Sequence, residues 1–266
     1  MIINNRFKVR SLILTAALIG GLSLVNHANA QQVGSYLIDL NSKTVTDLGE
    51  TYASAINDAG QVVGSYYPII NAPPHAFITG PNGMGMRDLG AIDANHINSA
   101  GQLVGRYYPI ANAPPHAFIT GPNGTGLRDL GALTASAIND AGQVAGTANF
   151  GHAFVTGPNG VGVSDLGTLG GIGSRATDIN DVGQVVGFAY TAEGESHAFV
   201  TGLNGVGMTD LNPLMSQLGV LPPLGGIWIN NNGQIVVTPI PEPEIYAMLL
   251  IGLGLIGFIA GHRRAT

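Results

Sequence analysis

Hydrophobic and polar positions between residues 31 and 240 recur in short strand-length segments that are separated by turn residues. Residues 53–57 and 61–67 flank Asn-Asp-Ala-Gly, and residues 75–79 and 84–89 flank Gly-Pro-Asn-Gly. Both connections are rich in residues that favour tight turns, with glycine able to supply positive φ. Each pair of segments is therefore predicted to form a β-hairpin. Two hairpins give four short strands within one unit of the chain.

The same unit recurs along the chain. A His-Ala-Phe string occurs four times, and an Asp-Leu pair always follows thirteen residues after its histidine. The repeated residues are His75, Phe77 and Asp88; His116, Phe118 and Asp129; His152, Phe154 and Asp165; and His197, Phe199 and Asp210. An Ile-Asn pair followed by Gly-Gln recurs five times, with its asparagine at Asn57, Asn98, Asn139, Asn180 and Asn230.

The two ends of this region carry complementary half-units. Asp47 and Leu48 form a fifth Asp-Leu pair, with Tyr36 in place of the phenylalanine, and residues 228–237 form a final first half without its His-Ala-Phe hairpin. A four-stranded unit every 40 to 45 residues is typical of a β-propeller blade, and one blade is commonly split between the chain ends. We therefore predict an all-β, five-bladed β-propeller closed by its N- and C-terminal halves. A β-solenoid and an open sandwich are the alternatives.

Residues 1–30 have the features of a secretory signal peptide. Arg6, Lys8 and Arg10 precede an uncharged segment, residues 11–25, and small residues follow at Ala28 and Ala30, before Gln31. This order predicts cleavage before Gln31 and export of a domain that spans residues 31–240. The alternative is an uncleaved N-terminal membrane helix, for which a run of fifteen residues is short.

The C-terminal segment, residues 241–266, has three parts. A Pro-Glu-Pro motif is followed by sixteen uncharged residues, 245–260, and then by two arginines; the defining residues are Pro241, Glu242, Pro243, Arg263 and Arg264. The uncharged part would make a helix of about 24 Å, which spans a bilayer when flanking arginines snorkel. The arginines would stay cytoplasmic. The alternatives are a permanent tail anchor and a buried helical hairpin.

These three parts resemble the PEP-CTERM sorting signal. The resemblance implies a Gram-negative bacterium, processing near Pro241 to Pro243 by a membrane-embedded exosortase, and delivery to the cell surface or to an exopolysaccharide matrix such as a biofilm. Before processing, the segment would hold the protein in the inner membrane.

The repeats of residues 31–237 resemble the HAF-repeat family of bacterial extracellular proteins. The His-Ala-Phe strings, the Ile-Asn and Gly-Gln blocks and the Asp-Leu-Gly elements carry this resemblance, while Tyr36 and Asn212 depart from it. The family implies an extracellular repeat protein and supplies no reaction and no catalytic residues.

Composition narrows the class of protein further. The chain has 40 glycines, no cysteine and only 10% charged residues, and its mean hydropathy is +0.27. Abundant glycine argues against a mainly helical fold, and the low charge argues against a disordered chain. Residues 31–240 contain 14 acids and five bases, so a nucleic acid is an unsuitable partner. Without disulfides, a core or a closed sheet must hold an exported domain together.

The repeated polar residues are predicted to be structural. Equivalent histidines of successive blades would lie far apart around a ring, which disfavours a shared metal ion. We expect the histidines and the aspartates of the Asp-Leu pairs to form bonds within or between blades. Asp58, Asp140 and Asp181 stand in Asn-Asp-x-Gly turns, where calcium binding is the alternative; Ser99 and Asn231 at the matching positions favour a turn role. No catalytic residue, metal site or cofactor is predicted.

Departures from the repeat are the better functional clues. Tyr66, Tyr67, Tyr107 and Tyr108 lie in two long connections between the second and third strands of their units. These connections share a face with the long blade-to-blade segments 167–175 and 212–226, and displayed loops commonly bind ligands. The tyrosine rings are candidates for sugar contact, with packing between blades as the alternative. The leading interpretation is a non-enzymatic exported surface or matrix protein, followed by a carbohydrate-binding module and then by a polysaccharide-acting enzyme.

Overall fold

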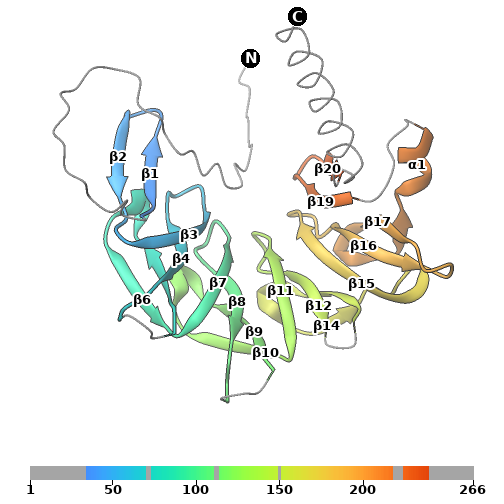
Figure 1. Cartoon of the computed structure of the whole chain (residues 1–266), viewed down its shortest axis with the longest axis horizontal. Helices are drawn as coiled ribbons and strands as arrows, with labels where there is room; N and C mark the ends of the chain where they lie inside the picture. The colour runs from blue at the N-terminus through green and yellow to red at the C-terminus, as the bar shows by residue number, and fades with distance from the viewer. Residues whose placement is uncertain (1–33, 70–72, 111–113, 149–150, 218–223, 240–266) are drawn as a thin grey trace, which may run out of the picture.

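The computed structural model of the protein describes residues 34–69, 73–110, 114–148, 151–217 and 224–239 (Figure 1). The predicted signal peptide and sorting segment lie outside the described residues. The described chain is a succession of short antiparallel strands that follow one another around an open arc (Figure 1). This arrangement confirms the prediction of an all-β chain built from repeated four-stranded sheets.

Four complete antiparallel sheets, called blades 1 to 4, form the arc, and the strands of each follow their order in the sequence. Blade 1 contains β3 (Thr51–Ile56), β4 (Val62–Tyr66), β5 (His75–Thr79) and β6 (Met86–Gly90). Blade 2 contains β7 (Ile92–Ile97), β8 (Leu103–Tyr107), β9 (His116–Thr120) and β10 (Leu127–Gly131). Blade 3 contains β11 (Leu133–Ile138), β12 (Val144–Ala148), β13 (Ala153–Thr156) and β14 (Val163–Asp165). Blade 4 contains β15 (Gly170–Ile179), β16 (Val185–Thr191), β17 (Ser196–Thr201) and β18 (Met208–Asp210).

The two half-units form separate two-stranded sheets at opposite ends of the arc (Figure 1). The N-terminal half-blade contains β1 (Tyr36–Asp39) and β2 (Thr44–Asp47), and the C-terminal half-blade contains β19 (Leu224–Ile229) and β20 (Ile235–Pro239). The predicted closure of the ring is not shown, because within the described residues no strand ladder joins the two half-blades.

Two segments that the sequence presented as connections have regular structure. Residues 167–175 run into β15, which begins at Gly170 and is longer than the first strand of any other blade. Residues 212–226 begin with the short helix α1 (Asn212–Gln217). Met215 of this helix is buried against blade 4 and the C-terminal half-blade, so the longer connection covers apolar surface that would otherwise face water.

The second hairpin of every blade turns through one recurring 3₁₀ turn, and these turns are η1 (Pro81–Gly83), η2 (Pro122–Gly124), η3 (Pro158–Gly160) and η4 (Leu203–Gly205). Asn82 adopts φ 54° and Gly83 adopts φ 71° in the first copy. Asparagine is one of the few non-glycine residues that tolerate this left-handed conformation. The Asn-Gly pair, which all four turns share although Leu203 replaces proline in the last, therefore fixes the turn locally, before any packing between blades.

Each blade is bound internally by a phenylalanine of the third strand that faces a glycine of the second strand. Phe77 pairs with Gly64 in blade 1, and its side chain is fully buried. A bulge in β3 brings the Tyr52 carbonyl oxygen to within 2.0 Å of the position that a Cβ at Gly64 would take. Only glycine fits there, and the same pairing recurs as Gly105 with Phe118, Gly146 with Phe154, and Gly187 with Phe199.

The hydrophobic core lies between neighbouring blades. One cluster joins Val63 and Ile78 of blade 1 to Leu103 and Phe118 of blade 2, and all four side chains are buried. Equivalent clusters join blades 2 and 3 and blades 3 and 4. The arc is therefore a stack of sheets packed face to face, which gives each blade two apolar faces.

A chain of side-chain amides crosses the arc from blade to blade, and we call it the Asn–Gln relay. The amide nitrogen of each relay asparagine donates to the carbonyl of the matching asparagine in the next unit: Asn57 to Asn98 (3.0 Å), Asn98 to Asn139 (3.0 Å), Asn139 to Asn180 (2.9 Å) and Asn180 to Asn230 (3.2 Å). The glutamine four residues later donates to the turn asparagine of the next blade: Gln61 to Asn123 (3.1 Å), Gln102 to Asn159 (3.1 Å) and Gln143 to Asn204 (3.4 Å).

The relay predicts a large stability difference between its middle and its end. Asn139→Ala removes bonds to Gln143 and the bond to the Asn180 carbonyl in a fully buried position. Urea unfolding should show a loss of about 2–4 kcal/mol, because buried polar groups lose their partners. Asn230→Ala is the matched control, since Asn230 bonds Gln234 in the same way and donates to no further blade among the described residues. Equal losses for the two variants would show that the bonds between blades contribute nothing.

Candidate functional site

The repeated histidine and aspartate of each blade meet at the outer hairpin. The histidine begins the third strand and the aspartate lies on the fourth, so the thirteen-residue spacing brings them side by side. His Nδ1 lies 3.0 Å from Asp88 Oδ2 in blade 1, 2.9 Å from Asp129 Oδ2 in blade 2, 2.9 Å from Asp165 Oδ2 in blade 3 and 2.8 Å from Asp210 Oδ2 in blade 4. These four His–Asp pairs are separate, one in each blade.

Each aspartate also accepts a backbone N–H two residues later. Asp88 Oδ1 accepts from Gly90, and Asp165 Oδ1 accepts from Gly167, both at 2.8 Å. The Gly90 N–H lowers the pKa of Asp88, and His75 lowers it further. Burial opposes this effect at Asp129, but His116 and the Gly131 N–H outweigh it, so the pKa of Asp129 is also lowered. The Asp88 and Asp129 carboxylates are therefore held in their charged form as hydrogen-bond acceptors.

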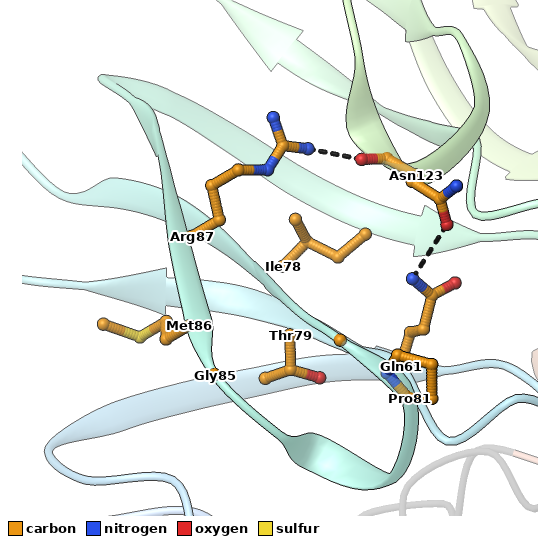
Figure 2. Close-up of a pocket in the computed structure, with 9 residues that line it drawn as sticks. Gln61, Ile78, Thr79, Pro81, Gly85, Met86, Arg87 and Asn123 are labelled. Carbon is orange, nitrogen blue, oxygen red and sulfur yellow. Dashed lines mark hydrogen bonds between the residues drawn. The ribbon is translucent and has the colours of Figure 1, made fainter.

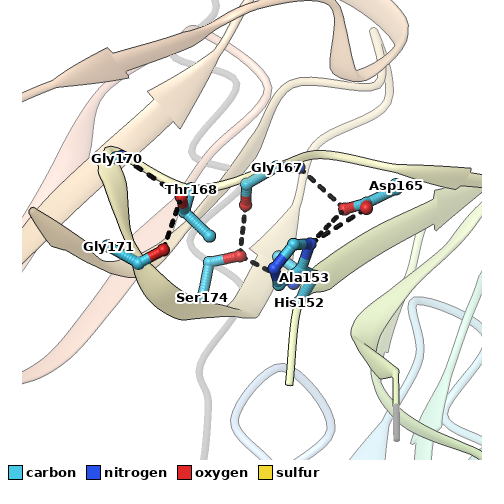
Figure 3. Close-up of polar contacts among 8 residues, drawn as sticks. All are labelled: His152, Ala153, Asp165, Gly167, Thr168, Gly170, Gly171 and Ser174. Carbon is cyan, nitrogen blue, oxygen red and sulfur yellow. Dashed lines mark hydrogen bonds and ion pairs between the residues drawn. The ribbon is translucent and has the colours of Figure 1, made fainter. Parts of the chain in front are cut away.

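Figure 3 shows how one such pair anchors the connection between blades 3 and 4. Asp165 contacts both His152 and the Gly167 N–H, and Ser174 accepts from the Ala153 N–H at 2.8 Å and donates to the Gly167 carbonyl. The pair is part of a closed set of bonds between β13, β14 and β15, so its polar atoms are engaged in structural contacts.

The four candidate tyrosines divide into two kinds. Tyr66 lies edge-on to His75 with ring centroids 5.9 Å apart, and Tyr107 lies edge-on to His116 at 6.0 Å. Desolvation and the neighbouring aspartate raise the pKa of both tyrosines. Tyr67 and Tyr108 are instead 57% and 55% exposed. Two of the four rings therefore pack against the His–Asp pairs. The other two are largely exposed, although the Tyr67 ring lies edge-on to Tyr52 with centroids 6.2 Å apart.

Tyr108 borders a cleft of about 230 Å³ between blades 1 and 2. Its lining residues are Pro73, Pro74, Ala91, Ile92, Asp93, Arg106 and Tyr108. Arg106 Nε donates to Asp93 Oδ2 at 2.8 Å, and this bond raises the pKa of Arg106. Blade 3 has Thr134 and Thr147 at the matching positions. The cleft therefore combines a cation, an acid and an exposed ring where the next blade has two neutral residues.

A second cleft, of about 330 Å³, lies beside the 3₁₀ turns of blades 1 and 2, with Pro81 of the first turn and Asn123 of the second in its lining (Figure 2). Gln61 donates to the Asn123 side chain at 3.1 Å, and Arg87 donates to the Asn123 carbonyl. Gln61, Arg87 and Asn123 thus form contacts between the two blades, as Figure 2 shows.

The turn aspartates also bind between blades. The Ser99 N–H donates to Asp140 Oδ1 at 3.0 Å, the Asp140 N–H donates to Asp181 Oδ1 at 3.0 Å, and the Asp181 N–H donates to Asn231 Oδ1 at 2.9 Å. In the described part of the chain, no three histidine or acidic side chains gather in an arrangement that could hold a metal ion.

The sequence spacing located the repeated residues but not all of their roles. The relay glutamines were visible as part of the Gly-Gln blocks, and nothing in one sequence indicated that they reach the turn asparagine of the next blade. The Arg106 and Asp93 pair was missed as well. A comparison of the four units position by position would have found it, because neither neighbouring blade has a charged residue at these positions.

Comparison with known proteins gives a sorting motif and a fold. Residues 239–264 match the model of the PEP-CTERM protein-sorting motif. No curated protein matches the chain. A protein described as a TolB candidate from Agrobacterium tumefaciens is similar in structure, with a TM-score of 0.52, 11% identity and coverage of 78% of this chain and 82% of that one.

Two further solved structures are similar to the chain. Oligogalacturonate lyase from Vibrio parahaemolyticus has a TM-score of 0.50 and 14% identity, with 79% of this chain and 65% of that one covered. TolB from Acinetobacter baumannii has a TM-score of 0.46 and 10% identity, and the chain covers 48% of it against 66% of its own length. The chain thus spans about half the length of that TolB.

The fold and the motif together define an all-β, propeller-type protein that carries a PEP-CTERM sorting motif. The motif implies export, a membrane-anchored precursor and processing by an exosortase. Among the described residues, no helix has the length and apolar character needed to cross a bilayer. The predicted span at residues 245–260 lies outside them.

The lowered aspartate pKa values predict a pH-dependent stability. A carboxyl group with a lower pKa in the folded state stabilises the fold above its unfolded pKa of about 4, and this contribution disappears as the pH falls through the lowered folded pKa. The melting temperature should therefore fall between about pH 5 and pH 3. In Asp129→Asn the melting temperature should be lower at pH 5 and should decline less steeply.

His116→Gln is the companion variant for this measurement. It removes the imidazole and keeps the Gly131 N–H that Asp129 also accepts, so it should retain part of the decline. If Asp129→Asn shows the full decline of the wild-type protein, these carboxylates are not its source.

Proposed function

We propose that the chain is an exported, non-enzymatic protein of the cell surface or exopolysaccharide matrix, processed at its C-terminal sorting segment. The observation that carries the proposal is the sorting motif at residues 239–264, directly after a domain of repeated blades. The His-Ala-Phe and Asp-Leu repeats support assignment of this domain to the HAF-repeat family.

A non-enzymatic role is supported by the use of the polar side chains. The His–Asp pairs, the Asn–Gln relay and the turn aspartates all bond to one another or to backbone groups of the repeat. A polysaccharide-acting enzyme, the third hypothesis, would need two acids that face each other on a binding face. The acid in the cleft between blades 1 and 2, Asp93, faces Arg106 instead.

The position of the last strand bears on how the precursor is held. β20 ends at Pro239, and one residue separates it from the Pro-Glu-Pro motif. At no more than about 3.6 Å per residue, the blades must lie against the membrane surface until the tail is removed. Processing would therefore release the whole domain and not merely trim it.

A carbohydrate-binding role is the second candidate, and the cleft between blades 1 and 2 favours it. Exposed Tyr108 offers a ring to the apolar face of a sugar, while Arg106 and Asp93 offer a donor and an acceptor beside it. Binding sites typically combine such an apolar surface with a few placed polar groups. Exopolysaccharide is the partner that this role would give to a matrix protein.

Intact mass spectrometry of the exported protein tests the leading proposal. The exported form should begin at Gln31 and should lack the residues after the Pro-Glu-Pro motif. A double variant, Pro241→Ala with Pro243→Ala, should stay in the membrane fraction at a mass that includes the tail. An extracellular form that retains residues 245–266 would contradict processing, whatever the protein binds.

Glycan retention tests the second candidate. On a column of exopolysaccharide from the producing cell, Tyr108→Ala should reduce retention about three- to tenfold, the range of one aromatic contact. Tyr190→Ala is the matched control, because Tyr190 is also an exposed tyrosine but lies on blade 4, in β16 and outside the cleft. Equal retention of the wild-type protein and both variants would exclude the cleft as a sugar site.

A further inference from the structure

The two flanks of the arc expose the positions that every complete blade buries. Val236 of β20 occupies the place that Val63 takes in β4; Val236 is 60% exposed, whereas Val63 is fully buried. Tyr36 of β1 occupies the place of Phe77 in β5, and the exposures are 57% and 0%. β20 lacks a third strand and β1 lacks a second strand, so each half-blade displays half of one core.

The Asn–Gln relay ends on these flanks with complementary groups. On the C-terminal flank, Asn230 Nδ2 donates only to Gln234 Oε1, and Gln234 Nε2 has no partner among the described residues. On the N-terminal flank, the Asn57 carbonyl accepts only from Gly60, and Asn82 Oδ1 accepts from no group in the described chain. Every interior interface pairs these same donors with these same acceptors. The C-terminal flank therefore presents the hydrogen-bond donors of one further interface, and the N-terminal flank presents its acceptors.

Both half-blades already sit in the register of a neighbouring blade. On the N-terminal flank, a Cβ at Gly83 would meet Leu37 and Leu48, as a Cβ at Gly160 would meet Ile119 and Leu130 between blades 2 and 3. On the C-terminal flank, Asn180 reaches the Asn230 carbonyl at 3.2 Å. Each half-blade is therefore already packed on its neighbouring blade, in the position where two further strands would complete the sheet.

We propose that the two flanks bind each other between copies of this chain, so that β19 and β20 of one copy and β1 and β2 of a second copy form one complete blade. The register of the other blades places Val236 opposite the second copy's Leu37 and Val237 opposite its Tyr36. Asn230 donates to the second copy's Asn57 carbonyl, and Gln234 donates to its Asn82. The proposal deepens the proposed function, because it gives the exported domain a partner.

The proposed joint, the blade formed by β19 and β20 of one copy and β1 and β2 of the next, differs from the complete blades at two residues that depart from the repeat. Val237 stands where complete blades have glycine, but β19 pairs with it regularly through Ile227, and the bulge lies further along at Leu224 and Gly226. No carbonyl is therefore forced against the Val237 side chain. Tyr36 in place of phenylalanine adds a hydroxyl group to the ring that meets this valine.

A second copy fits the flank better than the chain's own far end does. The four relay bonds between neighbouring units measure 2.9–3.2 Å with the ends of the arc apart (Figure 1). Adding a copy repeats an interface that already exists between the blades and leaves the ends of the arc where they are. The two flanks differ from each other, so the contact is head-to-tail and leaves a free flank at each end of the assembly.

Two variants block opposite flanks and test the proposal by complementation. Tyr36→Lys and Val236→Lys each place a charge at a position that is exposed in the single chain and buried in the joint, where an unpaired charge is strongly disfavoured. The full chain, kept in detergent, is measured by analytical ultracentrifugation. The wild-type protein should form oligomers that grow with concentration, and each variant alone should associate at least about tenfold more weakly.

An equal mixture of the two variants should form dimers and nothing larger, because only one intact joint remains. Val45→Lys is the matched control; Val45 is 65% exposed, three of its four counterparts, Met86, Leu127 and Val163, stay exposed in complete blades, and this variant should associate like the wild-type protein. A wild-type chain that stays monomeric at every concentration would overturn the proposal in favour of ring closure. Association that survives in both single variants would overturn it in favour of contacts through the tail.

Neither result depends on processing or on sugar binding. If the exported form keeps its tail, the proposed export pathway fails while the complementation result stands. If the tail is removed and the variants behave like the wild-type protein, the joint fails while the proposed function stands.

Discussion

The arrangement of the blades depends on one interaction, the donation of an asparagine amide to the carbonyl of the matching asparagine in the next unit. The apolar faces of neighbouring sheets would pack in several registers, because hydrophobic contact has little directionality. A buried amide accepts few geometries without losing a hydrogen bond. The relay therefore sets the register of each blade on the next, and the apolar clusters supply the free energy that holds them together.

The repeat reserves glycine for places where two backbones approach. At Gly64 a side chain would collide with the Tyr52 carbonyl, and the phenylalanine ring opposite fills the space above the glycine. The abundance of glycine thus has a cause beyond turns. It lets the bulged first strand and the second strand pack closely, which is what allows sheets of four short strands to bury a core without a cysteine.

The sequence predicted the strands well because their signals are local. The turns and the His–Asp spacing each lie within one unit of the sequence. The observed strands follow the predicted segments closely. The sequence could not predict the curvature of the arc, because curvature depends on packing between blades. For the same reason the glutamine contacts to Asn123 and the cleft beside Tyr108 were not foreseen: each joins residues of different units, which no spacing within one unit encodes.

The choice of neutral amides for the relay has a consequence for an exported protein. Asparagine and glutamine do not titrate, so the relay bonds keep their strength in acid, whereas the Asp88, Asp129 and Asp165 carboxylates of the outer hairpins have lowered pKa values and stabilise the fold only when ionised. Acid should therefore weaken the outer hairpins of blades 1 to 3 while the relay bonds persist. The C-terminal half-blade is joined to blade 4 by more than the Asn180 amide, because the Ile229 N–H donates to Asp178 Oδ2 at 3.0 Å and an apolar cluster spans the two sheets. Amide, carboxylate and apolar contacts therefore act together at this flank.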